Sequence, residues 1–206
     1  MGTAVPSPLG APSFPDVDAL VIGTSAGGVE ALLALLGALP AGFAPAVLAV
    51  IHLPPQSPSG LVEVLSQRCA LPVAEALDKQ PVRPGTVTLA PPNYHLLVEP
   101  GLTLALSQDE PVHFSRPAVD PLFESASVAY GPRVLALLLT GSSGDGSGGL
   151  AEIRRRGGQA WVQDPATAVA SAMPSAGLAL AGADRVLTIA EMCQCLTLAT
   201  LTDHNE

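Results

Sequence analysis

Three side chains of the kinds used in nucleophilic catalysis stand directly after apolar runs of the sequence. Ser25 and His52 each follow a short aliphatic run, and Asp145 lies in the glycine-rich loop after the most hydrophobic run. A serine hydroxyl becomes a good nucleophile only when a base removes its proton, and histidine is the usual base near neutral pH. A buried carboxylate can hold that histidine in the required tautomer. The three residues therefore predict a Ser/His/Asp catalytic set, with Asp164 as the alternative acid.

The stretch Val21–Gly28 has a Gly-x-Ser-x-Gly pattern between an apolar run and a segment with apolar residues at helical spacing. A strand, a glycine turn and a helix in this order can hold a serine out at the carboxyl end of a sheet. We expect Gly23 to permit the sharp turn and Gly27 to let the helix pack close to the strand. The first N–H groups of a helix have no partner within it, so those beside Ser25 can stabilise an oxyanion.

Two other kinds of glycine-rich loop, which bind dinucleotides or phosphate groups, have sequence patterns similar to this stretch. A dinucleotide-binding turn needs a second glycine at the place of Ser25, because the backbone must approach a pyrophosphate there. A phosphate-binding loop needs a lysine followed by serine or threonine, and this stretch has no lysine. A nucleophilic serine is the interpretation we carry forward, while glycine patterns of this length also arise by chance.

Among the four histidines, His52 is the preferred base. It stands at the end of a predicted buried strand, next along the chain from the strand that precedes Ser25. The other three are His95 at the start of a predicted hairpin strand, His113 in a loop and His204 in the tail. Position therefore separates one histidine from the rest.

The acids and the oxyanion donors are predicted from their place after strands. Asp145 is the preferred orienting acid, and its structural alternative is an N-cap for the helix that follows it. Asp164 precedes a proline, so its alternative role is a simple turn. The expected oxyanion donors are the backbone N–H groups of Ala26, Gly27 and Ser142.

The composition favours one α/β domain and excludes several classes of function. The 206 residues are 48% hydrophobic but only 3% aromatic, so the core must be aliphatic, which suits a parallel sheet covered by helices. A net charge of −9 argues against nucleic acid or an anionic membrane as the main partner. No apolar run approaches the roughly 20 residues of a membrane span. Three cysteines predict neither a disulfide framework nor a zinc site, and we expect a cytoplasmic protein without metal or cofactor.

Apolar runs alternate with helical patterns along most of the chain. This alternation predicts βαβ units and a single doubly wound, mostly parallel sheet flanked by helices. Scattered prolines and short apolar runs between positions 73 and 106 predict an antiparallel hairpin at one edge of the sheet. We expect residues 1–15 to be a flexible proline-rich lead-in, 16–202 the catalytic domain and 203–206 a tail. The arginines at 154–156 close a predicted helix, where they complement its dipole.

The chain order Ser, His, Asp differs from the order Ser, Asp, His of α/β-hydrolases. The sequence instead resembles the catalytic domain of the chemotaxis protein-glutamate methylesterases, the CheB family. The resemblance covers residues 18–196 and is specific because its motifs run in family order. These motifs are IGTSAGG (22–28), HLPP (52–55), APPNYH (90–95), RPAVDPLF (116–123), LTGSSGDG (139–146) and MP (173–174).

The resemblance implies a serine hydrolase that demethylates glutamate 5-methyl esters on the cytoplasmic helices of methyl-accepting chemoreceptors and releases methanol. It also implies deamidation of receptor glutamines. By position it makes Ser25 the nucleophile, His52 the base and Asp145 the orienting acid, which demotes Asp164. The alternatives are a divergent esterase of another chemosensory-type pathway, a non-catalytic binding module of the same fold and, more distantly, a nucleotide-binding module.

The sequence departs from the family pattern at two positions near the predicted site. After Ser25 the family often has threonine, whereas Ala26 has no hydroxyl. After Gly141 many members have methionine, whereas Ser142 keeps only the backbone N–H. The usual member also has a phosphorylatable receiver domain ahead of the catalytic domain, which the lead-in does not resemble, so we expect a separate regulator.

Overall fold

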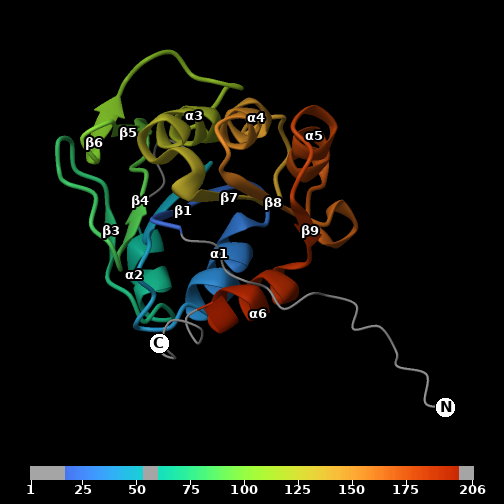
Figure 1. Cartoon of the computed structure of the whole chain (residues 1–206), viewed down its shortest axis with the longest axis horizontal. Helices are drawn as coiled ribbons and strands as arrows, with labels where there is room; N and C mark the ends of the chain where they lie inside the picture. Colours follow the sequence, from blue (N-terminus) through green and yellow to red (C-terminus); the bar gives the residue numbers. More distant parts are fainter. Residues whose placement is uncertain (1–16, 53–59, 200–206) are drawn as a thin grey trace.

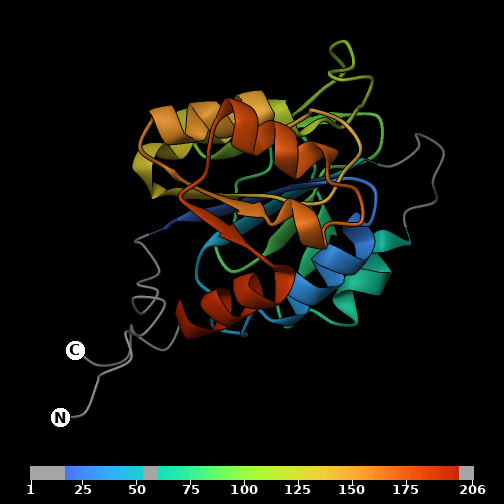
Figure 2. The same cartoon turned by 90° about the vertical axis from the view of Figure 1, so that its right-hand side faces the viewer.

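The computed structural model describes residues 17–52 and 60–199 (Figure 1). The predicted lead-in at 1–15, the predicted tail at 203–206 and residues 53–55 of the HLPP motif lie outside the described residues. The described residues form an α/β fold in which a central sheet lies between two layers of helices (Figure 2).

Seven parallel strands form the main sheet, in the order β3-β4-β2-β1-β7-β8-β9. Their bounds are β1 Ala19–Thr24, β2 Ala46–Ile51, β3 Val73–Glu75, β4 Val87–Leu89, β7 Val134–Leu138, β8 Gln159–Gln163 and β9 Arg185–Leu187. The chain winds outward from β1 in both directions, so the predicted doubly wound sheet is confirmed. Every residue of β1, β2 and β7 is buried, which explains their unbroken aliphatic runs.

Helices cover both faces of the sheet and divide the core in two. One layer contains α1 (Gly28–Gly37), α2 (Leu61–Ser66) and α6 (Ile189–Ala199), and the other contains α3 (Val119–Tyr130), α4 (Ser147–Arg155) and α5 (Ala172–Leu180) (Figures 1 and 2). Alternate residues of the strands belong to the two cores, because successive side chains of a strand point to opposite faces. Leu20 and Ile22 lie in the α1 core, for example, whereas Ala19 and Val21 lie in the α3 core.

The predicted antiparallel hairpin is present as β5 (His95–Glu99) and β6 (Thr103–Ser107). It forms a two-stranded sheet of its own beside α3 rather than an edge of the main sheet, whose edge strands are β3 and β9. The apolar side chains of Leu96, Val98 and Leu104 are buried in the core that α3 shares with the main sheet. Side-chain packing on that layer positions the hairpin, and backbone hydrogen bonds join β6 to residues 79–82, for example from the Leu104 N–H to the Gln80 carbonyl at 2.8 Å.

The arginine cluster at the end of α4 is exposed and paired with acids. Arg154 pairs with Asp184 at 3.2 Å, and Arg155 and Arg156 pair with Glu152 at 2.6 and 3.8 Å. These pairs favour the structural interpretation of the cluster. None of the helices in the described ranges combines the length and apolar character that crossing a bilayer demands.

Candidate functional site

The parallel sheet brings three of the predicted residues to one end, at the carboxyl ends of its central strands. Ser25 directly follows β1, His52 directly follows β2 and Asp145 lies between β7 and α4. The strand ends are tied to one another, because the Ser25 N–H donates to the Thr140 carbonyl at 2.9 Å and the His52 N–H donates to the Thr24 carbonyl at 3.2 Å. Open α/β sheets bind ligands at this end of their strands.

His52 and Asp145 form a direct pair. His52 Nε2 lies 2.7 Å from Asp145 Oδ2, and the two side chains are 12% and 0% exposed. A carboxylate at Nε2 favours the tautomer with its hydrogen on Nε2, which leaves Nδ1 as the proton acceptor. The Ser115 hydroxyl lies 3.3 Å from Nδ1. The ring is thus held from both sides.

The Asp145 carboxylate also caps a helix, although not the one that follows it. Oδ2 accepts from the Val119 N–H at 2.6 Å, and Oδ1 accepts from the Asp120 N–H at 3.0 Å, both in the first turn of α3. Burial alone would raise the pKa of Asp145, but the hydrogen bonds from His52, Val119 and Asp120 hold it below its usual value. The predicted N-cap role on α4 is wrong in its partner, because the N-cap of α4 is Gly146.

Asp120, in the first turn of α3, in turn caps α4. Its Oδ1 accepts from the Gly149 N–H, in the first turn of α4, at 2.7 Å. Burial, followed by the nearby charge of Asp145, raises the pKa of Asp120. His113 Nε2 lies 3.5 Å from Asp120 Oδ2 at the exposed side of the pair. The two aspartates therefore have pKa values shifted in opposite directions.

The loop that carries Ser25 depends on two glycines, and the turn predicted at Gly23 lies at Gly27 instead. Gly27 supplies the turn, since it is the N-cap of α1 with φ at +78°. Gly23 is the position of close approach, because a Cβ there would collide with the Val119 side chain. Only glycine meets both requirements without strain.

Thr140 fastens this loop from the neighbouring strand. Its carbonyl accepts from the Thr24 hydroxyl at 2.9 Å in addition to the Ser25 N–H. Its own hydroxyl donates to the Ala26 carbonyl at 2.8 Å and accepts from the Ala170 N–H at 2.9 Å. The backbone on both sides of Ser25 is therefore fixed by one residue.

The predicted oxyanion donors are backbone N–H groups without a partner among the described residues. The N–H groups of Ala26, Gly27 and Ser142 form no hydrogen bond with any described residue. Ser142 follows Gly141, whose backbone packs against Ser25 so closely that a Cβ added to it would lie 2.9 Å from the Ser25 Cβ. Unpaired donors on two segments therefore flank the serine.

Among the described residues, the ring of His52 is hydrogen-bonded to Asp145 and Ser115 and not to the Ser25 hydroxyl. Catalytic hydrogen bonds are often long in the absence of substrate and tighten when it is bound. Asp164, the alternative acid, makes the predicted turn instead, accepting from the Ala166 N–H at 2.9 Å. The structure thus joins His52 to Asp145 and places Asp164 elsewhere.

Sequence reasoning missed Ser115, Asp120 and Thr140 as supports of the site. Ser115 and Asp120 lie beyond β6, far from any strand end, and no local spacing marks them. The only signal was their position in or beside the motif RPAVDPLF, which contains Asp120 and directly follows Ser115.

Side chains of His113, Asp120 and Asp145 each offer a ligand atom within 4.8 Å of the others, the spacing of a possible metal site. The oxygens of Asp145 already accept hydrogen bonds from His52 and from three backbone N–H groups. A cation held there would compete with these hydrogen bonds, so the Asp145 carboxylate fits its present hydrogen-bond partners better than an ion.

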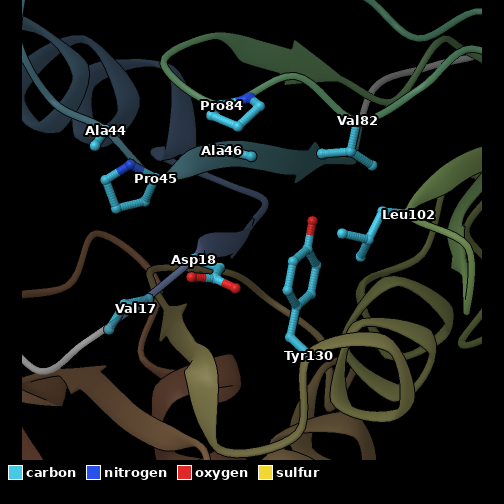
Figure 3. Close-up of a pocket in the computed structure, with 9 residues that line it drawn as sticks. All are labelled: Val17, Asp18, Ala44, Pro45, Ala46, Val82, Pro84, Leu102 and Tyr130. Carbon is cyan, nitrogen blue, oxygen red and sulfur yellow. The ribbon is translucent and has the colours of Figure 1, made fainter.

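A pocket of about 320 Å³ lies at the opposite end of the sheet (Figure 3). Asp18 and Ala46, at the amino-terminal ends of β1 and β2, line it together with Tyr130 at the end of α3. Figure 3 shows the Tyr130 hydroxyl pointing into it. Burial, followed by the charge of Asp18, raises the pKa of Tyr130 to about 12. This pocket contains none of the predicted catalytic residues.

Fold and site together define a doubly wound α/β protein with serine, histidine and aspartate gathered at the carboxyl ends of its central strands. The CheB methylesterase family matches residues 20–196. The chain therefore belongs to the CheB methylesterase family, and the resemblance seen in the sequence is confirmed.

Relatives and a solved structure agree with this assignment. A Leptospira interrogans relative is 39% identical over 177 residues, which cover 86% of this chain and 92% of the relative. A protein-glutamate methylesterase/protein-glutamine glutaminase of Nocardioides is 46% identical over 176 residues, covering 84% of this chain and 48% of that protein. The crystal structure of the Thermotoga maritima CheB methylesterase catalytic domain matches with a TM-score of 0.84 and 31% identity, covering 88% of this chain and 98% of that one.

Proposed function

We propose that this chain hydrolyses glutamate 5-methyl esters on the cytoplasmic helices of methyl-accepting chemoreceptors and releases methanol. The observation that carries the proposal is the His52–Asp145 pair at 2.7 Å, next to Ser25 at the carboxyl ends of the central strands. Relatives named protein-glutamate methylesterase/protein-glutamine glutaminase support the ester and amide specificity. Such a substrate also supports the cytoplasm as the place of action.

In the proposed reaction, Ser25 Oγ attacks the ester carbonyl while its proton passes to His52 Nδ1. Asp145 keeps the opposite nitrogen of the ring protonated and stabilises the imidazolium that forms. The oxyanion accepts hydrogen bonds from the N–H groups of Ala26, Gly27 and Ser142, each worth about 3–4 kcal/mol in such sites.

The proton on His52 then passes to the leaving methoxy group, and methanol departs. Water attacks the acyl-enzyme with His52 as the base, which regenerates Ser25 and leaves a free glutamate carboxylate. A receptor glutamine follows the same route and releases ammonia. Backbone donors serve the oxyanion, so the Ala26 and Ser142 side chains that depart from the family pattern are not needed for this step.

The decisive experiment measures methanol release from a methylated chemoreceptor cytoplasmic fragment by wild type, Ser25→Ala and Ser66→Ala. We expect release by wild type and by the Ser66 variant, which changes an exposed serine on α2, and a loss of at least about 100-fold for Ser25→Ala. Retention of more than a few per cent of the rate by Ser25→Ala would show that the nucleophile is wrong.

A non-catalytic binding module is the alternative of a different class. Labelling of Ser25 by a phosphonate ester separates the two, because the reagent reacts only with an activated serine. Labelling without methanol release would indicate a different ester substrate, whereas absence of both would favour the binding module. The expected separate regulator stays a prediction.

A further inference from the structure

The segment between β6 and α3 stands out from the body of the molecule (yellow-green in Figures 1 and 2). At its tip lies Phe114, which is 103% exposed and is the most exposed large apolar side chain in the described ranges. Both His113 and Phe114 have left-handed backbone angles, with φ at 48° and 61°. Bulky residues rarely adopt such angles unless the surrounding structure imposes them.

The structure holds this loop tightly. Val112 and Ser115 exchange backbone hydrogen bonds of 3.1 and 2.9 Å around the tip. The buried ring of His95 joins the two ends of the loop, because Nδ1 accepts from the Ala118 N–H at 3.2 Å and Nε2 lies 3.2 Å from the Glu110 carbonyl.

Arg116 adds a second set of bonds at the base of the loop. Its guanidinium donates to Asn93 Oδ1 at 2.8 Å and to the carbonyls of Gln108 and Asp109 at 2.8 and 2.9 Å. The exposure of Phe114 is therefore imposed by a bonded framework, and the ring is presented to the surroundings in a fixed place.

That place is the rim of the candidate site. Ser115, the residue after Phe114, contacts His52 Nδ1 at 3.3 Å. Beside the loop that carries Ser25, Val169 is 79% exposed. It packs on Gly27 so closely that a Cβ added to Gly27 would lie 2.6 Å from the Val169 Cβ. Single exposed apolar residues are common on protein surfaces, but these two stand beside the base and beside the nucleophile's loop.

We propose that Phe114 and Val169 are substrate-contact residues that bind apolar side chains flanking the esterified glutamate on the receptor helix. The inference rests on the proposed function. An ester at the tip of a helical side chain can reach Ser25 only if the helix itself lies on this rim. Residues three or four positions from the glutamate share its face of the helix, so they are the ones that contact Phe114.

The proposal distinguishes a protein substrate from a small ester. A small aryl acetate reaches Ser25 without touching the rim, whereas a receptor helix must cover it. Burial of a phenylalanine ring contributes enough that we expect Phe114→Ala to lower kcat/KM for the methylated receptor fragment roughly tenfold, mainly through KM. The kcat/KM for the receptor fragment, divided by the kcat/KM for the aryl acetate, should then fall by the same factor.

The experiment measures both substrates for wild type, Phe114→Ala, Phe114→Leu, Val169→Ala and the control Val128→Ala. Val128 is also exposed, at 53%, but lies in the second half of α3. We expect the leucine variant to restore most of the lost kcat/KM, Val169→Ala to lose less than Phe114→Ala and the control to match wild type.

Three results would overturn the proposal. Unchanged KM for the receptor fragment in Phe114→Ala would remove the contact while leaving the proposed function intact. An equal loss on the receptor fragment and on the aryl acetate would mean that the loop only supports the fold of the site. Absence of methanol release by wild type would remove the proposed function itself, and this inference with it.

Discussion

Asp120 and Asp145 exchange helix caps. Asp145 lies just ahead of α4 yet accepts from the first N–H groups of α3, while Asp120 lies in α3 and accepts from the Gly149 N–H of α4. Carboxylates at helix N-termini are stabilised by the unpaired N–H groups and by the helix dipole. The exchange locks two neighbouring helices together at the point where Asp145 holds His52.

The first prediction separates the two candidate acids. Asp145→Asn should lower kcat by about 10²–10⁴-fold, because the amide no longer fixes the His52 tautomer. It should also lower the free energy of unfolding by about 1–3 kcal/mol, since the amide NH2 group of asparagine would face a backbone N–H that the carboxylate now accepts from. Asp164→Asn is the matched control and should leave kcat unchanged; a comparable loss in that variant would restore Asp164 as the orienting acid. Steady-state methanol release and urea unfolding measure the two effects.

The second prediction decides which serine near His52 is the nucleophile. Ser115 lies 3.3 Å from Nδ1, a long and therefore weak hydrogen bond. Ser115→Ala should change kcat by less than about tenfold, and the protein should still react with a phosphonate at Ser25. Loss of phosphonate labelling in Ser115→Ala, with labelling kept in Ser25→Ala, would exchange their roles. Peptide mapping of the labelled protein gives the answer directly.

A third prediction concerns the fastening of the Ser25 loop. Thr140→Val keeps the shape of the side chain but removes the hydroxyl that bonds the Ala26 carbonyl and the Ala170 N–H. The free energy of unfolding should fall by about 1–3 kcal/mol, the usual result of leaving buried polar groups unpaired. Thr140→Ser retains the hydroxyl and should lose less. Equal losses in the two variants, measured by urea unfolding, would point to packing of the methyl group as the cause.

The fourth prediction is a pH dependence with a defined sign. Burial raises the folded-state pKa of Asp120 above the ordinary value of 3.8. The folded chain therefore keeps the proton on the Asp120 carboxyl group to higher pH than the unfolded chain does. The contribution of Asp120 to stability is therefore present below pH 3.8 and is lost as pH rises through the folded pKa. Asp120→Asn keeps an acceptor for the Gly149 N–H but does not ionise.

The melting temperature of Asp120→Asn, relative to wild type, should therefore increase as pH rises above 3.8 and become constant above the folded pKa. Glu63→Gln, an exposed acid-to-amide change on α2, serves as the control. A pH-independent difference for Asp120→Asn would mean that the Asp120 carboxylate is not penalised by its surroundings. Thermal melts between pH 4 and 8 test this.

Much of the fold follows from the sequence, because parallel strands buried on both faces leave a readable pattern. The ends of those strands identified Ser25, His52 and Asp145, and the structure joins His52 to Asp145 at 2.7 Å. The roles of these residues in catalysis stay predictions. The hairpin was predicted, but its separation from the main sheet was not, because short strands give no signal of the layer on which they pack.

The supports of the site were beyond prediction from local pattern. Ser115 reaches His52 across 63 positions of the chain, and Asp145 reaches the first turn of α3 across 25 or 26. Capping residues are normally sought next to the helix that they cap. Here each cap comes from the other helix's segment, so the sequence suggested the wrong partner for Asp145.

The strand order has a consequence for how the protein is made. The strand that leads to Ser25, β1, pairs with β7, which is synthesised more than a hundred positions later, as the pairing of Ala19 with Val134 shows. Chains emerge from the ribosome at about 5–20 residues per second, so β1 waits several seconds for its second neighbour. If Asp145 is the orienting acid, as predicted, the nascent chain lacks the complete catalytic set until the segment with Asp145 has left the ribosome.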